Sequence, residues 1–316
     1  MLLLTRRRKR CRREHDDGRV TELIVPAEFA DRTVRREGAA GKAWLDSLPE
    51  LADSYCREWA LRLDGEPRHG YAAVVVPATR ADGLPVALKL TWKDSETRDE
   101  PLALSTWHGQ GSVLLLENDP EHGALLLERL DSTRTLDGEP IEYAVEAAGS
   151  LLRRLAVPAP ADLSRDLRVE TAEVAENLPR SWRKFGEPMP RRLVDAAVEA
   201  CRDLGPDADR LLVNQDGHYQ NVLAGTREKW LVIDPKPLAG DVEFGAASLL
   251  WNRAPESTMD YRMAAIVEAA ELDAARARAW TLVRAVGNWF SMLEDEDADS
   301  PVFAAVPRIA HWAAGG

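Results

Sequence analysis

The chain has 316 residues, of which 45% are hydrophobic and 30% charged, and its formal net charge is −12. A chain of this length exceeds one small core, so two lobes are expected, and no apolar run approaches the roughly 18 residues that cross a bilayer. An acidic protein binds nucleic acid poorly, and three widely spaced cysteines without a C-x-x-C pair argue against a disulfide framework or a zinc site. We expect a cytoplasmic protein that binds neither nucleic acid nor membranes.

The first 20 residues differ from the rest in composition. Residues 1–13 hold seven Lys/Arg and no acid, and RRRKRCRR is followed by EHDDG. Such a block could be a nucleic-acid arm, but it lacks apolar periodicity. We expect residues 1–20 to form a disordered basic tail.

Residues 26–60 should be helical, and a β-sheet should follow. Apolar residues recur at helical spacing from Phe29 to Trp59, and Pro49 should divide the segment into two helices. A helix is also expected over residues 94–108. Short runs rich in Val or Leu predict five strands, at residues 61–63, 72–76, 85–92, 113–116 and 124–127.

After residues 128–131 the chain becomes mostly helical. Helical patterns cover residues 140–156, 170–184, 190–204, 243–253, 257–270, 273–294 and 302–313. One β-like island, residues 211–235, lies inside this half. The order predicts an α+β fold with two lobes, at residues 21–127 and 132–316, joined by a hinge at 128–131.

The strongest motif is NQDGHYQN at residues 214–221. Asp216 and Asn221 are five residues apart after the apolar Leu-Leu-Val, and a second strand ends in Asp234. Phosphoryl transfer needs a base near the acceptor hydroxyl and oxygen ligands for Mg²⁺. The pattern predicts Asp216 as the base and Asn221 and Asp234 as metal ligands. D-x-x-x-x-N alone would also fit a turn that its own side chains hold.

Lys89 lies in the apolar run VALKL, and Glu100 follows eleven residues later on the predicted helix. In kinases a strand Lys paired with a helix Glu holds the α- and β-phosphates. Glu96 competes as the partner, but Glu100 lies nearer the helix middle. The alternative is an exposed lysine and a solvated glutamate.

The run LLLERLD lies at the junction between the sheet-rich and helical halves. There the Glu128 carbonyl and the Leu130 amide could bind an adenine edge. An ordinary edge strand would have the same sequence.

VALKL, Glu100, LLLERLD, NQDGHYQNVL and WLVIDPKPLAGDVEFG together resemble the aminoglycoside-phosphotransferase family. The likeness is greatest to the branch of streptomycin 6-phosphotransferases and hydroxyurea-type resistance kinases, and it runs from about Val25 to the C-terminus. It implies a bilobal protein-kinase-like fold, with a small nucleotide-binding N-terminal lobe carrying a five-stranded antiparallel sheet. The helical C-terminal lobe would hold the catalytic loop and the acceptor site.

The resemblance also implies the activity and its cofactors. The enzyme would use ATP and Mg²⁺, with Asp216 as catalytic base and Lys89 as phosphate-binding lysine, to move the γ-phosphate onto a hydroxyl of an aminoglycoside-type small molecule. Two features depart from the family pattern. Asn214 and Gln215 replace the usual His-Gly before Asp216, and Gly217 replaces the usual Leu. A glycine loosens a catalytic loop.

The acceptor should be small, because eight residues between Asp234 and Glu243 leave no room for a peptide platform. Residues 201–316 hold 18 Asp/Glu against 11 Lys/Arg, which favours a cationic acceptor, although the excess could serve solubility. Candidate lining groups are Asp241, Glu243, Trp289 and the acidic run 294–299; each could equally be a cap, a core residue or a solvated group. A metabolic kinase for choline-like or sugar-like acceptors and a nucleotide-binding pseudokinase remain alternatives.

Overall fold

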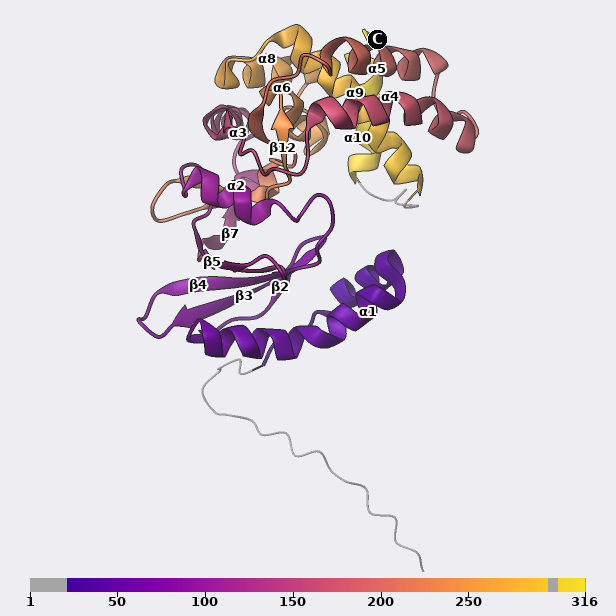
Figure 1. Cartoon of the computed structure of the whole chain (residues 1–316). Coiled ribbons are helices and arrows are strands. Elements are labelled where there is room, and N and C mark those ends of the chain that lie inside the picture. Colours follow the sequence, from indigo (N-terminus) through magenta and orange to yellow (C-terminus); the bar gives the residue numbers. More distant parts are fainter. Residues whose placement is uncertain (1–21, 295–300, 316) are drawn as a thin grey trace, which may run out of the picture. The chain divides into compact units, whose positions relative to one another are not determined.

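The computed structural model describes residues 22–294 and 301–315 (Figure 1). The tail expected at residues 1–20 and most of the acidic run 294–299 lie outside them. The chain divides into two compact units, with the boundary between Leu88 and Lys89. The hinge expected at residues 128–131 falls inside the second unit and stays a prediction. Within the described ranges no helix is both long and apolar enough to span a membrane.

The first unit combines one long helix with short strands. Its elements are α1 (Ala27–Glu58), β1 (Leu61–Leu63), β2 (Arg68–His69), β3 (Ala73–Arg80) and the first part of β4 (Pro85–Thr91). Strands β1 and β2 both pair antiparallel with β3. Helix α1 buries Phe29 and Leu48 and packs on β1.

Helix α1 breaks at Gly38 and not at Pro49, so the predicted position of the break was wrong. Gly38 has φ 60° and ψ −136°, a conformation that glycine adopts without steric cost, whereas Pro49 lies inside continuous helix. The sequence pattern located the proline but missed the glycine, which lies in a stretch rich in small residues.

The second unit begins inside β4, and the last residue of β4 forms a hydrogen bond to a hairpin. The hairpin consists of β5 (Leu115–Asp119) and β6 (Ala124–Glu128), paired antiparallel, and the Thr91 amide donates to the Gly123 carbonyl at its turn. Helix α2 (Glu100–Trp107) precedes the hairpin and begins later than predicted. Between residue 22 and Glu128 the structure therefore has six strands, β1 to β6, where five were expected; the two-residue β2 is the addition.

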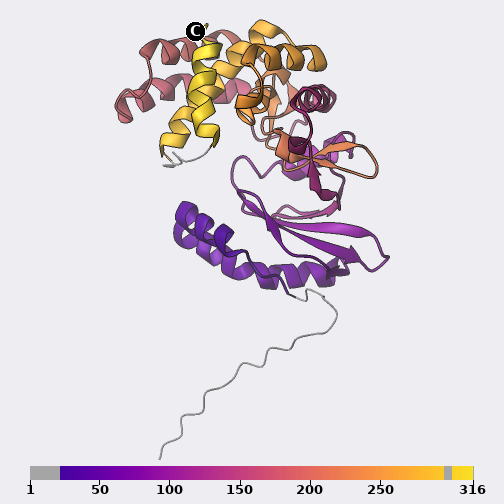
Figure 2. The same ribbon diagram turned by 180° about the vertical axis from the view of Figure 1, so that it is seen from behind.

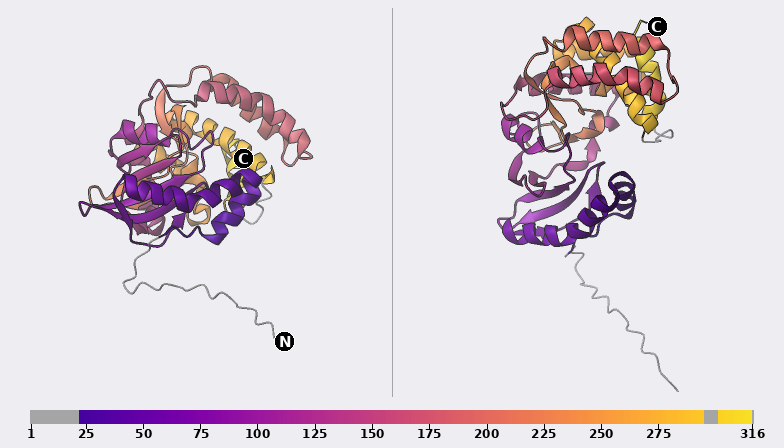
Figure 3. Two further views of the ribbon diagram at one scale, coloured as in Figure 1. Left: turned by 60° about the horizontal axis from the view of Figure 1, so that its bottom comes forward. Right: turned by 45° about the vertical axis from the view of Figure 1, so that its right-hand side comes forward.

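The remainder of the second unit is largely helical, as predicted (Figure 2). Helix α3 packs on α8, α4 lies beside α5, and α9 packs against α5 and α10 (Figure 3). The predicted helix at 243–253 is divided into the short helices α6 and α7. The bounds are α3 (Ile141–Leu155), α4 (Leu167–Lys184), α5 (Arg191–Leu204), α6 (Val242–Gly245), α7 (Ser248–Trp251), α8 (Met259–Ala270), α9 (Ala274–Glu294) and α10 (Pro301–Ala313).

Two small antiparallel sheets position the predicted catalytic loops. One has the order β11-β10-β7 and the other β12-β9-β8. Register pairs Val222 with Val232 in the first sheet and Asn214 with Pro237 in the second. The segment from β9 to β10 and the segment from β11 to β12 are therefore held next to each other at both ends. The bounds are β7 (Asp131–Thr135), β8 (Val157–Pro158), β9 (Leu211–Asn214), β10 (Val222–Ala224), β11 (Trp230–Val232) and β12 (Pro237–Gly240).

Candidate active site

A triad of charges, with two buried members and the half-buried Asp234, forms around Lys89 at the start of the second unit. Lys89 Nζ lies 2.6 and 2.7 Å from the two carboxylate oxygens of Glu100, and 2.6 Å from Asp234 Oδ1. The side chains of Lys89 and Glu100 are only 4% and 1% exposed, so an unpaired charge there would be costly. The expected pairing of Lys89 with Glu100 is present, and Asp234 joins it from a distant part of the chain.

The proton affinities in the triad follow from burial and charge. Burial raises the pKa of Glu100 to about 7, although Lys89 opposes the shift. Burial also acts to raise the pKa of Asp234, but Lys89 outweighs it and holds that pKa below its ordinary value. For Lys89, burial acts to lower the pKa, yet Asp234 and Glu100 together keep it above the usual range. Lys89 and Asp234 are therefore charged at neutral pH.

Asp234 follows β11 with a left-handed backbone, at φ 49°. Asp tolerates this region better than most residues, and such conformations persist where the surroundings hold them. Here the short salt bridge to Lys89 holds the side chain.

The loop after β9 is fixed on both sides of Asp216. Asn214 Oδ1 accepts the Asp216 amide at 3.0 Å and the Lys236 amide at 3.0 Å. Asn221 Nδ2 donates to the Asp216 carbonyl, also at 3.0 Å. Asn214, a departure from the family pattern, thus cross-links the two neighbouring segments.

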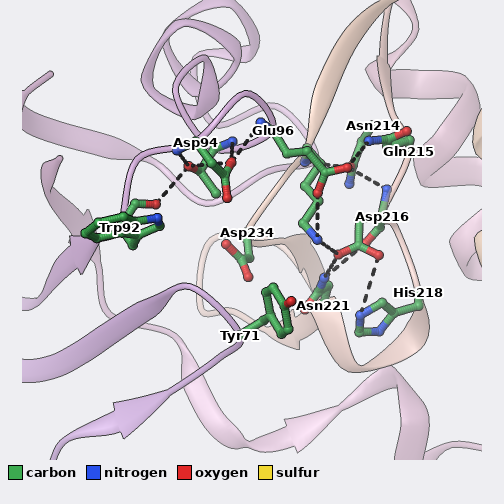
Figure 4. Close-up of polar contacts among 12 residues, drawn as sticks. Tyr71, Trp92, Asp94, Glu96, Asn214, Gln215, Asp216, His218, Asn221 and Asp234 are labelled. Atoms are coloured by element: carbon green, nitrogen blue, oxygen red, sulfur yellow. Dashed lines mark hydrogen bonds and ion pairs between the residues drawn. The ribbon is translucent and has the colours of Figure 1, made fainter. Parts of the chain in front are cut away.

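A second cation, Lys236, lies beside the Asp216 carboxylate, which Figure 4 shows next to His218 and Asn221. Its Nζ is 3.5 Å from Asp216 Oδ2 and 3.3 Å from Glu96 Oε2. Glu96 Oε1 accepts from Gln215 Nε2 at 3.3 Å. On the other side, His218 Nε2 lies 3.9 Å from Asp216 Oδ1. Glu96, the rival partner for Lys89, therefore belongs to this cluster.

Arg284 supports the same loop from α9. Its Nη1 donates to the Gln215 carbonyl at 2.7 Å, and its guanidinium lies 4.8 Å from the Trp251 ring centroid and 5.1 Å from that of Phe244. Burial lowers the pKa of Arg284 to about 10, which leaves it charged at neutral pH. Sequence reasoning missed the roles of Lys236 and Arg284; the only signal was their presence in family-like strings.

The donor set near Asp216 fits a magnesium ion. Because the amide nitrogen of Asn221 donates to Asp216, its Oδ1 remains to accept a metal, and Asp234 offers a carboxylate. Both are hard oxygen donors, and Mg²⁺ commonly uses one or two carboxylates or amides plus substrate phosphates. Over the described ranges no cluster of three His, Cys, Asp or Glu side chains that could hold a metal ion is found. A two-ligand site completed by phosphates is consistent with that arrangement.

Residues 58–294 match the model of the aminoglycoside/hydroxyurea antibiotic resistance kinase family. The chain belongs to this family. A hydroxyurea phosphotransferase of Kitasatospora aureofaciens is 39% identical over 281 residues, which cover 88% of this chain and 82% of the relative. A streptomycin 6-kinase of Streptomyces griseus is 39% identical over 285 residues, or 86% and 92% of the two chains. The protein is therefore a small-molecule kinase, as predicted.

Solved structures of the same fold include two small-molecule kinases. Aminoglycoside phosphotransferase APH(4)-Ia, in a ternary complex with ADP and hygromycin B, superposes with a TM-score of 0.60 at 15% identity, covering 84% of this chain and 98% of that one. Choline kinase LicA from Streptococcus pneumoniae gives 0.57 at 15% identity, covering 84% and 97%. The α+β, protein-kinase-like fold class of this kinase is confirmed.

The side chain of Glu128, from the predicted adenine-binding segment of the kinase, makes local contacts. Glu128 Oε1 accepts the Leu114 amide at 2.8 Å and Arg227 Nη2 at 2.7 Å. These contacts hold the end of β6 in place. They occupy the Glu128 side chain, so only its backbone would be able to bind adenine. Leu130 follows two residues later and is half-buried. Binding of adenine by Glu128 and Leu130 stays a prediction.

Asp241, one of the residues predicted to contact the acceptor, is fully buried, and its carboxylate is occupied by hydrogen bonds within the protein. Its carboxylate accepts the Asp209 amide at 2.7 Å, Arg276 Nε at 2.5 Å and Trp280 Nε1 at 2.7 Å. It joins α6 to α9, and its surroundings give no support to a contact with substrate.

The other two predicted acceptor residues also have neighbours within the protein. Glu243 accepts the Asp273 amide at 3.1 Å and is 8% exposed. Trp289 is half-buried beside the His311 ring. Roles for these two side chains toward substrate stay predictions.

A cavity of about 490 Å³ lies between α4, α9 and the segment before α2. Residues of α4 from Glu170 to Ser181 line it at helical spacing, and α9 contributes from Gly287 to Glu294. Its acidic lining residues are Glu96, Glu170, Glu173 and Glu294, and its apolar ones are Val174, Leu178, Phe185 and Phe290. Glu96 therefore borders both the cavity and the Asp216 cluster.

Proposed function

We propose that this kinase transfers the γ-phosphate of ATP to a hydroxyl of an aminoglycoside-type antibiotic, with Asp216 as general base. The observation that supports it most is the convergence of the buried Lys89 and Glu100 with Asp234, while the neighbouring loop holds Asp216 and Asn221 in place. We assign Lys89 to the α- and β-phosphates and Asn221 and Asp234 to Mg²⁺. A bound Mg²⁺ would neutralise phosphate charge. Since the donor is ATP, we expect the enzyme to work in the cytoplasm.

Asp216 would accept the proton of the acceptor hydroxyl at one particular oxygen. Oδ2 lies 3.5 Å from Lys236 Nζ and 3.5 Å from Asn221 Nδ2, whereas Oδ1 lies 3.9 Å from His218 Nε2. A base needs its acceptor oxygen within hydrogen-bond reach of the hydroxyl. We therefore assign proton transfer to Oδ1, while Oδ2 keeps the carboxylate oriented.

The cavity between α4 and α9 would hold the acceptor. Glu96 lines it and is separated from Asp216 by the single ammonium of Lys236. Of its other carboxylates, Glu170 is paired with Arg165, but Glu173 has no ion-pair partner among the residues that the structure describes. Carboxylates beside apolar side chains suit a ring that carries amino or guanidino groups.

A product screen tests this function. The purified protein is incubated with ATP, Mg²⁺ and a panel of aminoglycosides, hydroxyurea, choline and simple sugars, and products are identified by mass spectrometry. We expect an aminoglycoside to gain one phosphate, and Asp216→Asn to reduce the rate on the order of 10² to 10⁴. Preferential phosphorylation of choline or a sugar would favour the metabolic alternative. Nucleotide binding without any product would favour a pseudokinase.

A further inference from the structure

Lys236 occupies a fixed place between the base and the proposed acceptor cavity. Its backbone is tied to the catalytic loop at both ends, because its amide donates to Asn214 Oδ1 at 3.0 Å and its carbonyl accepts the Gln215 amide at 3.2 Å. Its side chain is 22% exposed, so the ammonium is sheltered but reachable. The position of this cation is therefore set by the fold.

The contacts of the ammonium differ from those of Lys89. Lys236 Nζ lies 3.3 Å from Glu96 and 3.5 Å from Asp216, whereas Lys89 makes contacts of 2.6 to 2.7 Å. A charge-assisted N–H···O hydrogen bond is about 2.7–2.9 Å long, so both of these contacts of Lys236 are longer than such a hydrogen bond.

Phosphoryl transfer at Asp216 creates a demand for positive charge. The transferring group carries charge on its three equatorial oxygens and must come close to the Asp216 carboxylate, which repels it. Lys89 is engaged with Glu100 and Asp234, and Arg284 with the Gln215 carbonyl. Lys236 is the ammonium that the loop before β12 places directly beside Asp216.

We propose that Lys236 is a further catalytic residue, which binds an oxygen of the γ-phosphoryl group during transfer while Glu96 holds it from the acceptor side. In that step the acceptor oxygen forms a bond to phosphorus and the bond to the β-phosphate oxygen breaks. ADP leaves with that electron pair, and the acceptor proton passes to Asp216. The inference rests on the proposed kinase reaction. It assigns to Lys236 the positive charge that stabilises the γ-phosphoryl group during transfer.

Nucleotide binding distinguishes this role from a structural one. Affinities for the non-hydrolysable triphosphate AMP-PNP and for ADP are measured by calorimetry with Mg²⁺, for the wild type, Lys236→Met, Lys236→Arg and the exposed-lysine control Lys229→Met. We expect Lys236→Met to weaken AMP-PNP binding about tenfold or more, with ADP binding changed less than about twofold. Lys236→Arg should recover part of the AMP-PNP affinity, and the control should match the wild type.

Turnover and melting temperature complete the test. We expect kcat of Lys236→Met to fall on the order of 10² to 10³, with a melting transition still present. A fall in kcat with an unchanged preference for AMP-PNP over ADP would mean that Lys236 only positions Asp216, and would overturn the phosphate contact. An equal loss of both nucleotides would overturn it as well. A wild-type protein that binds neither nucleotide would contradict the proposed reaction itself.

Discussion

The side chain of Asn214 accepts the backbone amide of Lys236 at 3.0 Å, and so joins the segment after β9 to the segment before β12. The same oxygen accepts the Asp216 amide, and Asn214 is only 3% exposed. The buried side-chain amide of Asn214 thus sets the spacing between Asp216 and the residues that follow Asp234.

We expect Asn214→Ala to destabilise the fold by about 1–3 kcal/mol, because it leaves two backbone amides without their acceptor. The loss of activity should exceed what the loss of folded protein explains, because Asp216 loses the hydrogen bond that orients it. Urea unfolding and kcat at a temperature where the variant is folded measure the two effects. Asn118→Ala, at an exposed asparagine, is the control. Equal stability of the two variants would contradict the cross-link.

The raised pKa of Glu100 predicts a pH-dependent stability. Its pKa is about 7 in the folded protein against an ordinary 4.5, so the folded state holds this proton more tightly than the unfolded state. The stabilisation is complete below the unfolded-state pKa and is lost as the pH rises through the folded-state pKa. From about pH 5 to pH 8, the nucleotide-free wild type should lose on the order of 2 kcal/mol relative to Glu100→Gln.

Denaturant unfolding at several pH values tests this. Glu117→Gln, at an exposed glutamate on β5, should keep the slope of the wild type. Parallel curves for the wild type and Glu100→Gln would show that Glu100 does not titrate in this range.

Asp234→Asn should weaken the response to Mg²⁺ about tenfold or more, because it removes the charge of the proposed metal ligand while keeping the side-chain shape. The rate is followed as a function of Mg²⁺ at saturating ATP. Asp216→Asn provides the contrast, since it should lower kcat without moving the Mg²⁺ midpoint. An unchanged midpoint for Asp234→Asn would remove Asp234 from the metal site.

Gly287 allows the proposed acceptor cavity to be filled. A Cβ at this helical position would meet no atom within 4 Å, and the residue lines the cavity. We expect Gly287→Leu to raise the acceptor KM about tenfold and leave the ATP KM unchanged. Gly287→Ala should keep both constants and stabilise α9 by about 0.5–1 kcal/mol. Wild-type acceptor kinetics in the leucine variant would show that the acceptor binds elsewhere.

Gly217 can be replaced without strain, although it follows the base directly. Its φ lies outside the left-handed region, and a Cβ would meet only Asn214 Nδ2, at 3.5 Å. Gly217→Ala should therefore stabilise the protein by about 0.4–1 kcal/mol, through a less flexible unfolded chain. Calorimetric melting and kcat are the measurements. We expect turnover to hold or rise, and a lower melting temperature would refute the idea that this glycine merely loosens the loop.

Spacing along the chain predicted which residues form the candidate site. It did not predict which residues surround them. Lys89, Glu100 and Asp234 could be named because phosphoryl transfer demands those groups on a strand, a helix and a strand end. The pairing of Glu96 with Lys236 could not be predicted, since it joins residues 140 positions apart in the sequence. Asp241 was predicted to line the acceptor pocket because nothing local shows that Arg276 and Trp280 on α9 enclose it.

Helix α9 performs two different tasks along its length. Near its beginning, Arg276 and Trp280 bind the buried Asp241, while its last two turns, from Gly287 to Glu294, face the cavity. Residues that hold the helix in place are thus separate from residues that would touch the proposed acceptor. Substitutions at Gly287 and the exposed Ser291 should then alter which acceptors are phosphorylated at little cost to folding, so single mutations in these two turns should change the acceptor range.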